Sequence, residues 1–411
     1  MSDRFLPYGR HQLDEDDVAA VTAVLRGDWL TTGPMVEKFE AALAAKVGAR
    51  YAVVCSSGTA ALHLAVLAAG LKRGDRAIVP SLTFLATANA VRYAGAEVVF
   101  ADVDGETGLL RTGDLEAAID SAPGPIAAVL PVHLAGQCVD MPAIAAIARA
   151  RDMIVIEDAC HALGTTYTVG DEVIVVGSCR HSDMAVFSFH PVKAITTGEG
   201  GVITTNDPKL YKRLKLLRSH GMTREAADFE NADLAFAADG KPNLWYYEMP
   251  EPGFNYRLSD INCALGLSQL NKLDRFVERR RALAGIYDGL LAQLAPTILP
   301  PKRVPDCDPA WHLYAPRFQF LETGLARDAL MRRLQAVGIG TQVHYIPVHR
   351  QPYYRRTLGE QQLLGAMTYY RQTLSLPVFP AMQDADVSRV VEALSQALSA
   401  ASHDANDLLI P

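Results

Sequence analysis

Short apolar runs rich in β-branched residues alternate with helical stretches along the first half of the chain. Seven such runs occupy residues 51–56, 75–81, 97–104, 126–136, 153–160, 184–190 and 200–206. Helical periodicity separates most of the earlier runs, as at residues 57–70, 84–95 and 140–152. Apolar strands that alternate with helices are typical of a mostly parallel sheet covered on both faces. The sequence therefore predicts an α/β fold with a mostly parallel, seven-stranded sheet.

The last two runs differ from the others in how they are connected. The link between residues 184–190 and 200–206 is short and shows no helical pattern. Parallel neighbours need a crossover of a dozen or more residues. We therefore expect the final strand to run antiparallel or to pair with its predecessor as a hairpin.

Helical patterns also precede and follow the predicted strands along the chain. Residues 13–29 form an amphipathic stretch that opens with acidic side chains, which suit the positive end of a helix. Pro34 begins a second helix for which Gly48 is a suitable C-cap. From Asp260 the pattern predicts one long helix that runs through Leu294 and leads away from the sheet.

A smaller α+β unit is expected after this long helix. We interpret residues 312–321 and 341–348 as strands and residues 325–338 as a helix. The sequence thus predicts a large domain with an N-terminal arm at residues 1–265 and a small C-terminal domain at residues 266–411.

Composition and charge exclude several classes of protein. The chain has 411 residues, of which 49% are hydrophobic and 21% charged, and its formal net charge is −7. This is an ordinary globular composition that can build a sizeable core. No basic stripe indicates a nucleic-acid partner, and no apolar run is long enough to cross a membrane. The first residues also lack the apolar centre of a secretory signal, so we expect a cytoplasmic protein.

The six cysteines are scattered along the chain and form no CxxC pair. In a chain of this length they indicate reduced thiols rather than a disulfide framework. A zinc site built from Cys160, His161 and Cys179 is conceivable, but their spacing fits no usual zinc pattern. We therefore expect no metal.

Four features lie where strands end, which is where ligands bind in such sheets. The first is the segment CSSGTAAL, which closes a strand at Cys55 and opens a helix. Free N–H groups and hydroxyls at a helix start can hold a phosphate, although the same residues are ordinary capping residues. The chain has no GxxxxGK motif, so this is not a P-loop.

The next two features are an acid and an aromatic residue. Asp158 ends an apolar strand and could keep a cationic ring nitrogen protonated, or it could cap a turn. His161 lies three residues further on and could contact the same ligand, although a single histidine is often structural. Phe84 ends another strand, where it could cover a flat ring or belong to the core.

The fourth feature is Lys193, which lies between the apolar run FSFH and the polar segment TTGEGG. A lysine near apolar and cationic groups has a lowered pKa and can attack a carbonyl carbon, whereas most lysines are simply solvated. Pyridoxal phosphate needs a lysine for its aldehyde, an acid for its ring nitrogen, a flat cover and a phosphate seat. The four features together predict that cofactor.

Six long motifs contain or follow these residues, namely SFHPVKAITTGEGG, SSGTAAL, SLTFLATANAV, EDACHALG, LRSHGM and GFNYRLSDINCALGLSQL. Together they resemble the DegT/DnrJ/EryC1/StrS family of sugar aminotransferases. The resemblance extends from about Trp29 to about His344 and implies the type I aminotransferase fold. Within the family, EDACHALG, LRSHGM and TQVHYIPVHRQPYY are most similar to the branch that acts in pseudaminic acid synthesis.

The resemblance implies roles for individual residues. Lys193 matches the lysine that binds the cofactor covalently, Asp158 the partner of the ring nitrogen, and Phe84 the aromatic that covers the ring. The phosphate contacts correspond to Gly58, Thr59, Ser188 and Asn255. Asn255 matches a residue supplied by the neighbouring subunit, which implies a homodimer with shared active sites. His161 matches a position beside the ring hydroxyl, where many members carry Gln and the pseudaminic branch carries His.

The resemblance also implies the substrates. Glutamate is the expected amino donor, and a UDP-linked 4-keto-6-deoxy-HexNAc, aminated at C4, is the expected acceptor. Weaker candidates for contacts with the sugar or diphosphate, each with a possible structural role, are His220, Arg257, His344 and His349.

The sequence also has to be weighed against several rival functions. The nearest is another family aminotransferase that acts at C3 or C4 of a dTDP-, GDP- or other UDP-keto sugar. The 3-dehydratase branch replaces the cofactor lysine with histidine, so Lys193 argues against it. A non-catalytic cofactor- or sugar-binding regulator is disfavoured by the intact set of Lys193, Asp158 and Ser188. A nicotinamide enzyme is disfavoured because no GxGxxG follows the first strand.

Overall fold

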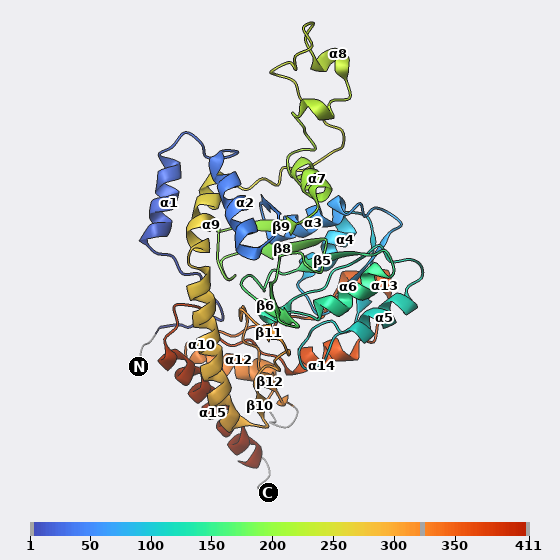
Figure 1. Cartoon of the computed structure of the whole chain (residues 1–411). Helices are drawn as coiled ribbons and strands as arrows, with labels where there is room; N and C mark the ends of the chain where they lie inside the picture. Colours follow the sequence, from blue (N-terminus) through green and yellow to red (C-terminus); the bar gives the residue numbers. More distant parts are fainter. Residues whose placement is uncertain (1–3, 321–324, 408–411) are drawn as a thin grey trace.

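The computed structural model describes residues 4–320 and 325–407, and a seven-stranded sheet lies at its centre (Figure 1). The strands are β1 (Tyr51–Cys55), β2 (Arg76–Pro80), β3 (Glu97–Ala101), β4 (Ala128–Val129), β5 (Ile154–Asp158), β8 (Met184–Ser188) and β9 (Gly201–Thr205). Their order is β1-β9-β8-β5-β4-β2-β3. β9 is antiparallel to β1 and β8, and every other pair is parallel. The predicted α/β fold and its antiparallel last strand are confirmed.

Helices cover both faces of this sheet because each strand directs successive apolar side chains to opposite sides. Val53 and Val54 are neighbours in β1 and belong to different cores. The core that contains Val54 is completed by α2 (Pro34–Val47), α5 (Thr112–Ser121), α6 (Met141–Arg149) and α9 (Asp260–Leu270). The core that contains Val53 is completed by α3 (Gly58–Ala68), α4 (Leu85–Tyr93) and α7 (Pro208–Arg218).

Both predicted N-terminal helices form, and their ends have identifiable causes. α1 (Glu15–Leu25) begins with a capping box, in which the N–H of Asp14 donates to Oδ2 of Asp17 at 3.0 Å. Asp260 of α9 accepts hydrogen bonds from two backbone N–H groups at the start of α2. α2 ends as predicted at Gly48, whose φ of 77° lies in the left-handed region that glycine adopts without strain.

The predicted long helix after the sheet is wrong, because the chain forms two helices, α9 and α10 (Leu273–Leu291). They are separated at Asn271 and Lys272. The turn allows Lys272 to form ion pairs with Asp14 and, at 2.9 Å, with Asp17. This joint therefore holds α1 against the rest of the chain.

A third core lies in the C-terminal third and includes Leu6 from the N-terminal segment. α10 connects two of the cores, because Phe276 belongs to the core that contains Val54 and Tyr287 belongs to the third core. The other elements of this region are η3 (Ala292–Leu294), β10 (Ile298–Leu299), β11 (Cys307–Asp308), β12 (Arg317–Phe318), α12 (Arg327–Ala336), η4 (Val348–Arg350), α13 (Pro352–Leu358), α14 (Leu364–Gln372) and α15 (Asp384–Asp407). α12 confirms the predicted helix. None of the described helices combines the length and apolar character needed to cross a membrane.

The two strands predicted for this region need correction. Of residues 312–321, only those of β12 form a strand in the described part, and residue 321 lies outside it. Residues 341–348 form no strand, and a single bridge joins one of them to a later segment. Pro347 has no N–H to donate, and η4 begins directly after it.

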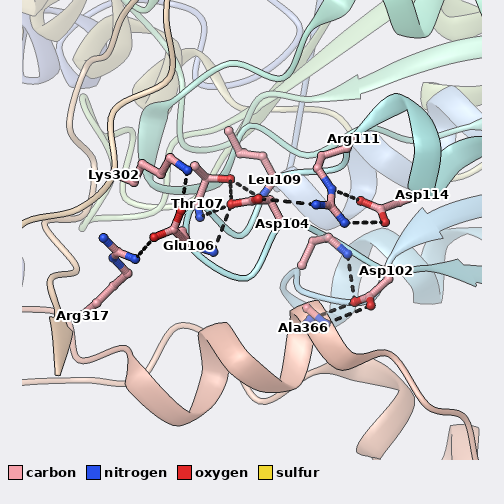
Figure 2. Close-up of polar contacts among 12 residues, drawn as sticks. Asp102, Asp104, Glu106, Thr107, Leu109, Arg111, Asp114, Lys302, Arg317 and Ala366 are labelled. Carbon is pink, nitrogen blue, oxygen red and sulfur yellow. Dashed lines mark hydrogen bonds and ion pairs between the residues drawn. The ribbon is translucent and has the colours of Figure 1, made fainter. Parts of the chain in front are cut away.

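The loop after β3 ties the large sheet to the C-terminal region (Figure 2). Asp102 accepts hydrogen bonds from the N–H groups of Gly365 and Ala366, at 2.9 and 2.8 Å, and so caps the start of α14. Glu106 pairs with Lys302 and with Arg317. The division into domains at residues 1–265 and 266–411 stays a prediction.

Candidate active site

A pocket of about 570 Å³ lies at the carboxyl ends of β1, β2, β5 and β8. Its walls bring together seven of the eight residues that the sequence analysis assigned to the cofactor, namely Gly58, Thr59, Phe84, Asp158, His161, Ser188 and Lys193. These residues come from four separate strand ends. Parallel strands end at one edge of a sheet, and that is why such distant segments meet there.

The start of α3 forms one end of this pocket. Ser57 is an N-cap whose Oγ accepts a hydrogen bond from the N–H of Ala60 at 3.1 Å. A Cβ on Gly58 would lie only 2.7 Å from Cβ of Ser188, so glycine is required for this close approach. The first N–H groups of a helix have no partner within it. The capping and phosphate-seat interpretations are therefore compatible at this helix start.

Asp158 is buried at the end of β5 and is held by two hydrogen bonds. Its Oδ2 accepts a bond from Oγ1 of Thr87 at 2.6 Å, and its Oδ1 accepts one from the N–H of Cys160 at 3.2 Å. A carboxylate has about four lone-pair sites. These bonds leave part of that capacity unused, and Asp158 lines the pocket.

Lys193 is presented by a short segment that is fixed at both ends. Its N–H donates to the carbonyl of His190 at 2.9 Å, and Thr196 and Thr197 both donate to the carbonyl of Phe189. Burial lowers the pKa of the Lys193 amine, while Cys160 and Asp158 act in the opposite direction. Lys193 is therefore an amine held inside a pocket rather than a surface charge.

Three buried histidines, His161, His312 and His344, lie near enough to Lys193 for its charge to act on them. Nδ1 of His161 accepts a hydrogen bond from the N–H of Ala135, in η1 (Leu134–Gly136), at 3.3 Å. The proton of neutral His161 is thus assigned to Nε2, which lies 3.0 Å from the hydroxyl of Tyr345. The His161 and His312 ring centroids are 4.3 Å apart, and Nδ1 of His344 lies 2.8 Å from Oγ of Ser375.

The three histidines stay neutral in the folded protein. Burial lowers the pKa of His161 and of His312 well below the ordinary histidine value, and nearby positive charge adds to this effect. Burial likewise lowers the pKa of His344 from 6.5 to about 3, with a further contribution from Lys193. These three side chains are therefore uncharged at neutral pH.

These shifts predict that the protein loses stability in mild acid. Below about pH 6.5 the unfolded chain binds protons at these three positions and the folded chain does not. Each position therefore lowers the free energy of unfolding by about 1.4 kcal/mol for every pH unit below this value. Stability is retained above this pH and is lost as the pH falls. Thermal denaturation over a pH series measures the slope. His312→Gln should reduce the slope by about 1.4 kcal/mol per pH unit. An unchanged slope in His312→Gln would contradict the argument.

The remaining predicted residues fall into two groups. Phe84 is 54% exposed on the pocket wall, with its ring centroid 5.8 Å from that of Tyr345, so it is not a core aromatic. Asn255 is exposed, forms a bridge with Ser219 and does not line the pocket of its own chain.

Of the four weaker candidates, only His344 lines the pocket. His349 is buried and lies 2.5 Å from Oγ of Ser81 through its Nδ1. His220 is exposed and has a φ of 65°, in the left-handed region. Arg257 is half-buried outside the pocket lining. The structure thus does not bring these four side chains together.

Sequence reasoning missed Tyr8, Tyr345 and Thr87. Tyr8 lines the pocket from the N-terminal segment, which no local pattern could have placed there. Tyr345 lies in the stretch that was interpreted as a strand. Thr87 could have been noticed, because it follows Thr83 by four residues and that spacing places both on one side of a helix start.

The residues of this pocket fit pyridoxal phosphate. The glycine-lined helix start suits a phosphate, the acceptor-only carboxylate suits a protonated ring nitrogen, and the exposed Phe84 face suits a flat ring. The half-buried Lys193 suits an aldehyde. Among the described residues, no group of three or more His, Cys, Asp or Glu side chains could hold a metal ion.

Comparisons with known proteins agree with this chemistry. A model of the DegT/DnrJ/EryC1/StrS aminotransferase family matches residues 11–395. The spore coat polysaccharide biosynthesis protein SpsC of Bacillus subtilis is 40% identical over 393 residues, which cover 95% of this chain and 96% of SpsC.

Two solved structures are also similar. Helicobacter pylori PseC, an aminotransferase involved in the biosynthesis of pseudoaminic acid, has a TM-score of 0.86 at 28% identity, and the match covers 97% of this chain and 100% of PseC. The PLP form of the putative sugar aminotransferase Spr1654 from Streptococcus pneumoniae has a TM-score of 0.83 at 26% identity, over 97% and 99% of the two chains.

Proposed function

We propose a substrate and a set of residue roles for this chain, which belongs to the DegT/DnrJ/EryC1/StrS aminotransferase family and is a PLP-dependent sugar aminotransferase. The amino donor is glutamate. The acceptor is the C4 keto group of UDP-2-acetamido-2,6-dideoxy-β-L-arabino-hex-4-ulose. The product is UDP-4-amino-4,6-dideoxy-N-acetyl-β-L-altrosamine, a precursor of pseudaminic acid.

The observation that carries the chemistry is the meeting of Lys193 and Asp158 in one pocket. When bound, pyridoxal phosphate withdraws electrons from the carbon that bears the amine, through its protonated ring nitrogen. Asp158 holds the proton on that nitrogen. Lys193 binds the cofactor and, once released, its amine accepts and returns the proton of the substrate carbon. The lowered pKa of Lys193 favours the neutral amine that this step needs.

The other pocket residues orient the ligand. Gly58, Thr59 and Ser188 hold the cofactor phosphate at the start of α3, where the helix dipole favours negative charge. Phe84 covers one face of the ring and excludes water from it. His161, whose Nε2 lies 3.0 Å from the hydroxyl of Tyr345, would contact the ring hydroxyl of the bound cofactor.

Two observations bear on the choice of sugar. The likeness to PseC over almost the whole chain supports the pseudaminic acid precursor. The 40% identical relative is named for spore coat polysaccharide synthesis instead. It supports the alternative that the acceptor is another keto sugar, linked to UDP, dTDP or GDP and aminated at C4 or C3.

A substrate panel tests this proposal. The purified protein is incubated with glutamate and each keto sugar, and the product is identified by mass and by NMR of the new C–N position. The UDP-linked 4-keto sugar, generated by a UDP-GlcNAc 5-inverting dehydratase, should give the highest kcat/KM. Preferential amination of a dTDP- or GDP-linked sugar, or amination at C3, would overturn the proposed substrate and leave the family chemistry intact.

We also propose that the active site is shared across a homodimer. Lys193 is the only lysine or arginine among the described residues that line the pocket, which also contains Asp158 and Glu199. The cofactor phosphate, the glutamate carboxylates and a nucleotide diphosphate are all anionic and need further donors. Asn255 and Arg257 lie outside their own pocket and are suited to supply these donors to a partner.

An exposed apolar surface also supports a partner subunit. Residues 223–252, with η2 (Ala226–Asp228) and α8 (Ala232–Ala235), form an arm that projects away from the sheet (Figure 1). Its side chains Leu244, Trp245, Tyr247 and Met249 are all more than half exposed. A cluster of large apolar side chains of this kind marks an interaction surface, and a second copy of the chain is the proposed occupant.

Mixing two inactive variants tests the shared site. Asn255→Asp places a negative charge against the phosphate, and Lys193→Ala removes the amine. A mixed dimer has one site in which both residues are intact, so random mixing should restore about a quarter of wild-type activity if dimers exchange freely. The control mixes Lys193→Ala with Lys193→Ala/Asn255→Asp, which gives no intact site. Equal activity in both mixtures would contradict a shared site.

We place the reaction in the cytoplasm. All six cysteines are free, and the N–H of Cys138 donates to Sγ of Cys307 at 3.3 Å. Free thiols suit a reducing compartment.

A further inference from the structure

Two threonines form a hydrogen-bonded chain that ends on Asp158. Oγ1 of Thr83 lies 2.8 Å from Oγ1 of Thr87, and Oγ1 of Thr87 lies 2.6 Å from Oδ2 of Asp158. Thr83 and Thr87 are buried, although Thr83 also lines the pocket. α4 begins between the two threonines, and this geometry brings their hydroxyls to one side of the helix start.

The direction of this chain is fixed by the carboxylate. An ionised carboxylate can only accept, so Thr87 donates its single proton to Asp158. Thr83 must then donate to Thr87. The carbonyl of Phe84 lies 3.3 Å from the Thr87 hydroxyl and is the competing acceptor that a threonine near a helix start often uses. The shorter contact to a charged acceptor is the stronger one, so the proton lies toward Asp158.

We propose that Thr87 is a positioning residue for the amino-transfer reaction, acting through Asp158. Its hydrogen bond stabilises the ionised carboxylate and fixes the rotation of the side chain, while the N–H of Cys160 holds the other oxygen. The carboxylate is thus held in one orientation where it lines the pocket. This inference rests on the proposed role of Asp158 as partner of the cofactor ring nitrogen.

The position of Thr87 also links the acid to the ring cover. Phe84 is the N-cap of α4, and the N–H of Thr87 donates to its carbonyl at 3.4 Å. One turn of chain therefore sets both the side chain that faces the ring and the hydroxyl that holds the acid. A shift of this turn would move both together, and we expect loss of the hydroxyl alone to affect only the acid.

The test compares Thr87→Val with Thr87→Ser. Valine keeps the shape and removes the hydroxyl, and serine keeps the hydroxyl. Thr87→Val should lower kcat about tenfold with little change in KM, and it should lower by about one unit the pH at which the bound cofactor ring nitrogen loses its proton. NMR of cofactor labelled with ¹⁵N in the ring measures that proton directly. Thr87→Ser should restore most of both properties.

Thr205→Val is the matched control. Thr205 is equally buried, its hydroxyl donates to the carbonyl of Asp183 at 2.7 Å, and it lies at the opposite edge of the sheet. This variant should lose thermal stability without any change in the ring-nitrogen titration. If Thr87→Val behaves in the same way, the residue is merely structural and the inference is wrong.

Asp158→Asn separates this inference from the proposal on which it rests. If Asp158→Asn changes the ring-nitrogen titration and Thr87→Val does not, the inference on Thr87 fails alone. If neither variant changes the titration, the role proposed for Asp158 fails, and the inference fails with it. A change in both variants, restored by Thr87→Ser, supports both statements.

Discussion

Replacement of Lys193 by arginine is expected to lower kcat by about 10⁴-fold. Proton transfer by a positioned base contributes about 10²–10⁴-fold, and loss of the covalent attachment of the cofactor adds to this. Arginine keeps a positive charge but cannot lose its proton at neutral pH, so it can act neither as nucleophile nor as base. The measurement is the rate of glutamate-dependent amination under saturating cofactor.

Two variants accompany this experiment. Lys193→Ala should show the same loss, because the reason is the missing amine and not the size of the new side chain. Lys209→Arg makes the same exchange at an exposed position on α7 and should keep wild-type turnover. Turnover within about tenfold of wild type in Lys193→Arg would refute its role, since a tenfold change is only about 1.4 kcal/mol.

The second large effect is expected at Asp158. Asp158→Asn keeps the size of the side chain and removes the charge that we propose faces the ring nitrogen. Breaking a buried charge pair costs about 3–5 kcal/mol, so kcat should fall by about 10²–10⁴-fold. KM for glutamate should change much less, because the pair acts on the reacting carbon and not on the donor carboxylates. Steady-state kinetics and the absorbance of the bound cofactor measure the two effects.

Asp158→Glu is the informative companion of this variant. It keeps the charge but moves it by one methylene group, away from the hydrogen bonds of Thr87 and Cys160. An intermediate loss is expected, since charge is retained and geometry is not. If Asp158→Asn were as active as the wild type, the ring nitrogen would need another partner and the site proposed here would be wrong.

The large sheet was predictable because its cause is local. The strands are apolar on both faces, so each appears as a continuous run, and the short link from β8 to β9 leaves no room for a parallel crossover. The site followed from the same logic. Once the strand ends are known, the topology brings Asp158, Ser188 and Lys193 to one edge.

The errors arose where tertiary contacts decide the local structure. The break between α9 and α10 is stabilised by the pairing of Lys272 with Asp14 and Asp17, far apart in sequence. The hairpin of β6 (Thr166–Val169) and β7 (Glu172–Val175) was missed, and its edge partner β11 (Cys307–Asp308) comes from the C-terminal third.

Residues that act through others were equally hard to foresee. Tyr345 became visible only through its contact with His161, and Thr87 through its contact with Asp158. Each role depends on a hydrogen bond between two side chains that lie far apart in the sequence. A motif can indicate the residue that carries the chemistry, but the residue that holds it in place has no signature of its own.

The most direct test of the account is the site of attachment of the cofactor. The protein is reconstituted with pyridoxal phosphate, reduced with borohydride and digested, and the modified peptide is identified by mass spectrometry. The account predicts a single pyridoxyl group on Lys193, absent from Lys193→Arg. Stoichiometric modification of any other lysine, with Lys193 unmodified, would contradict it.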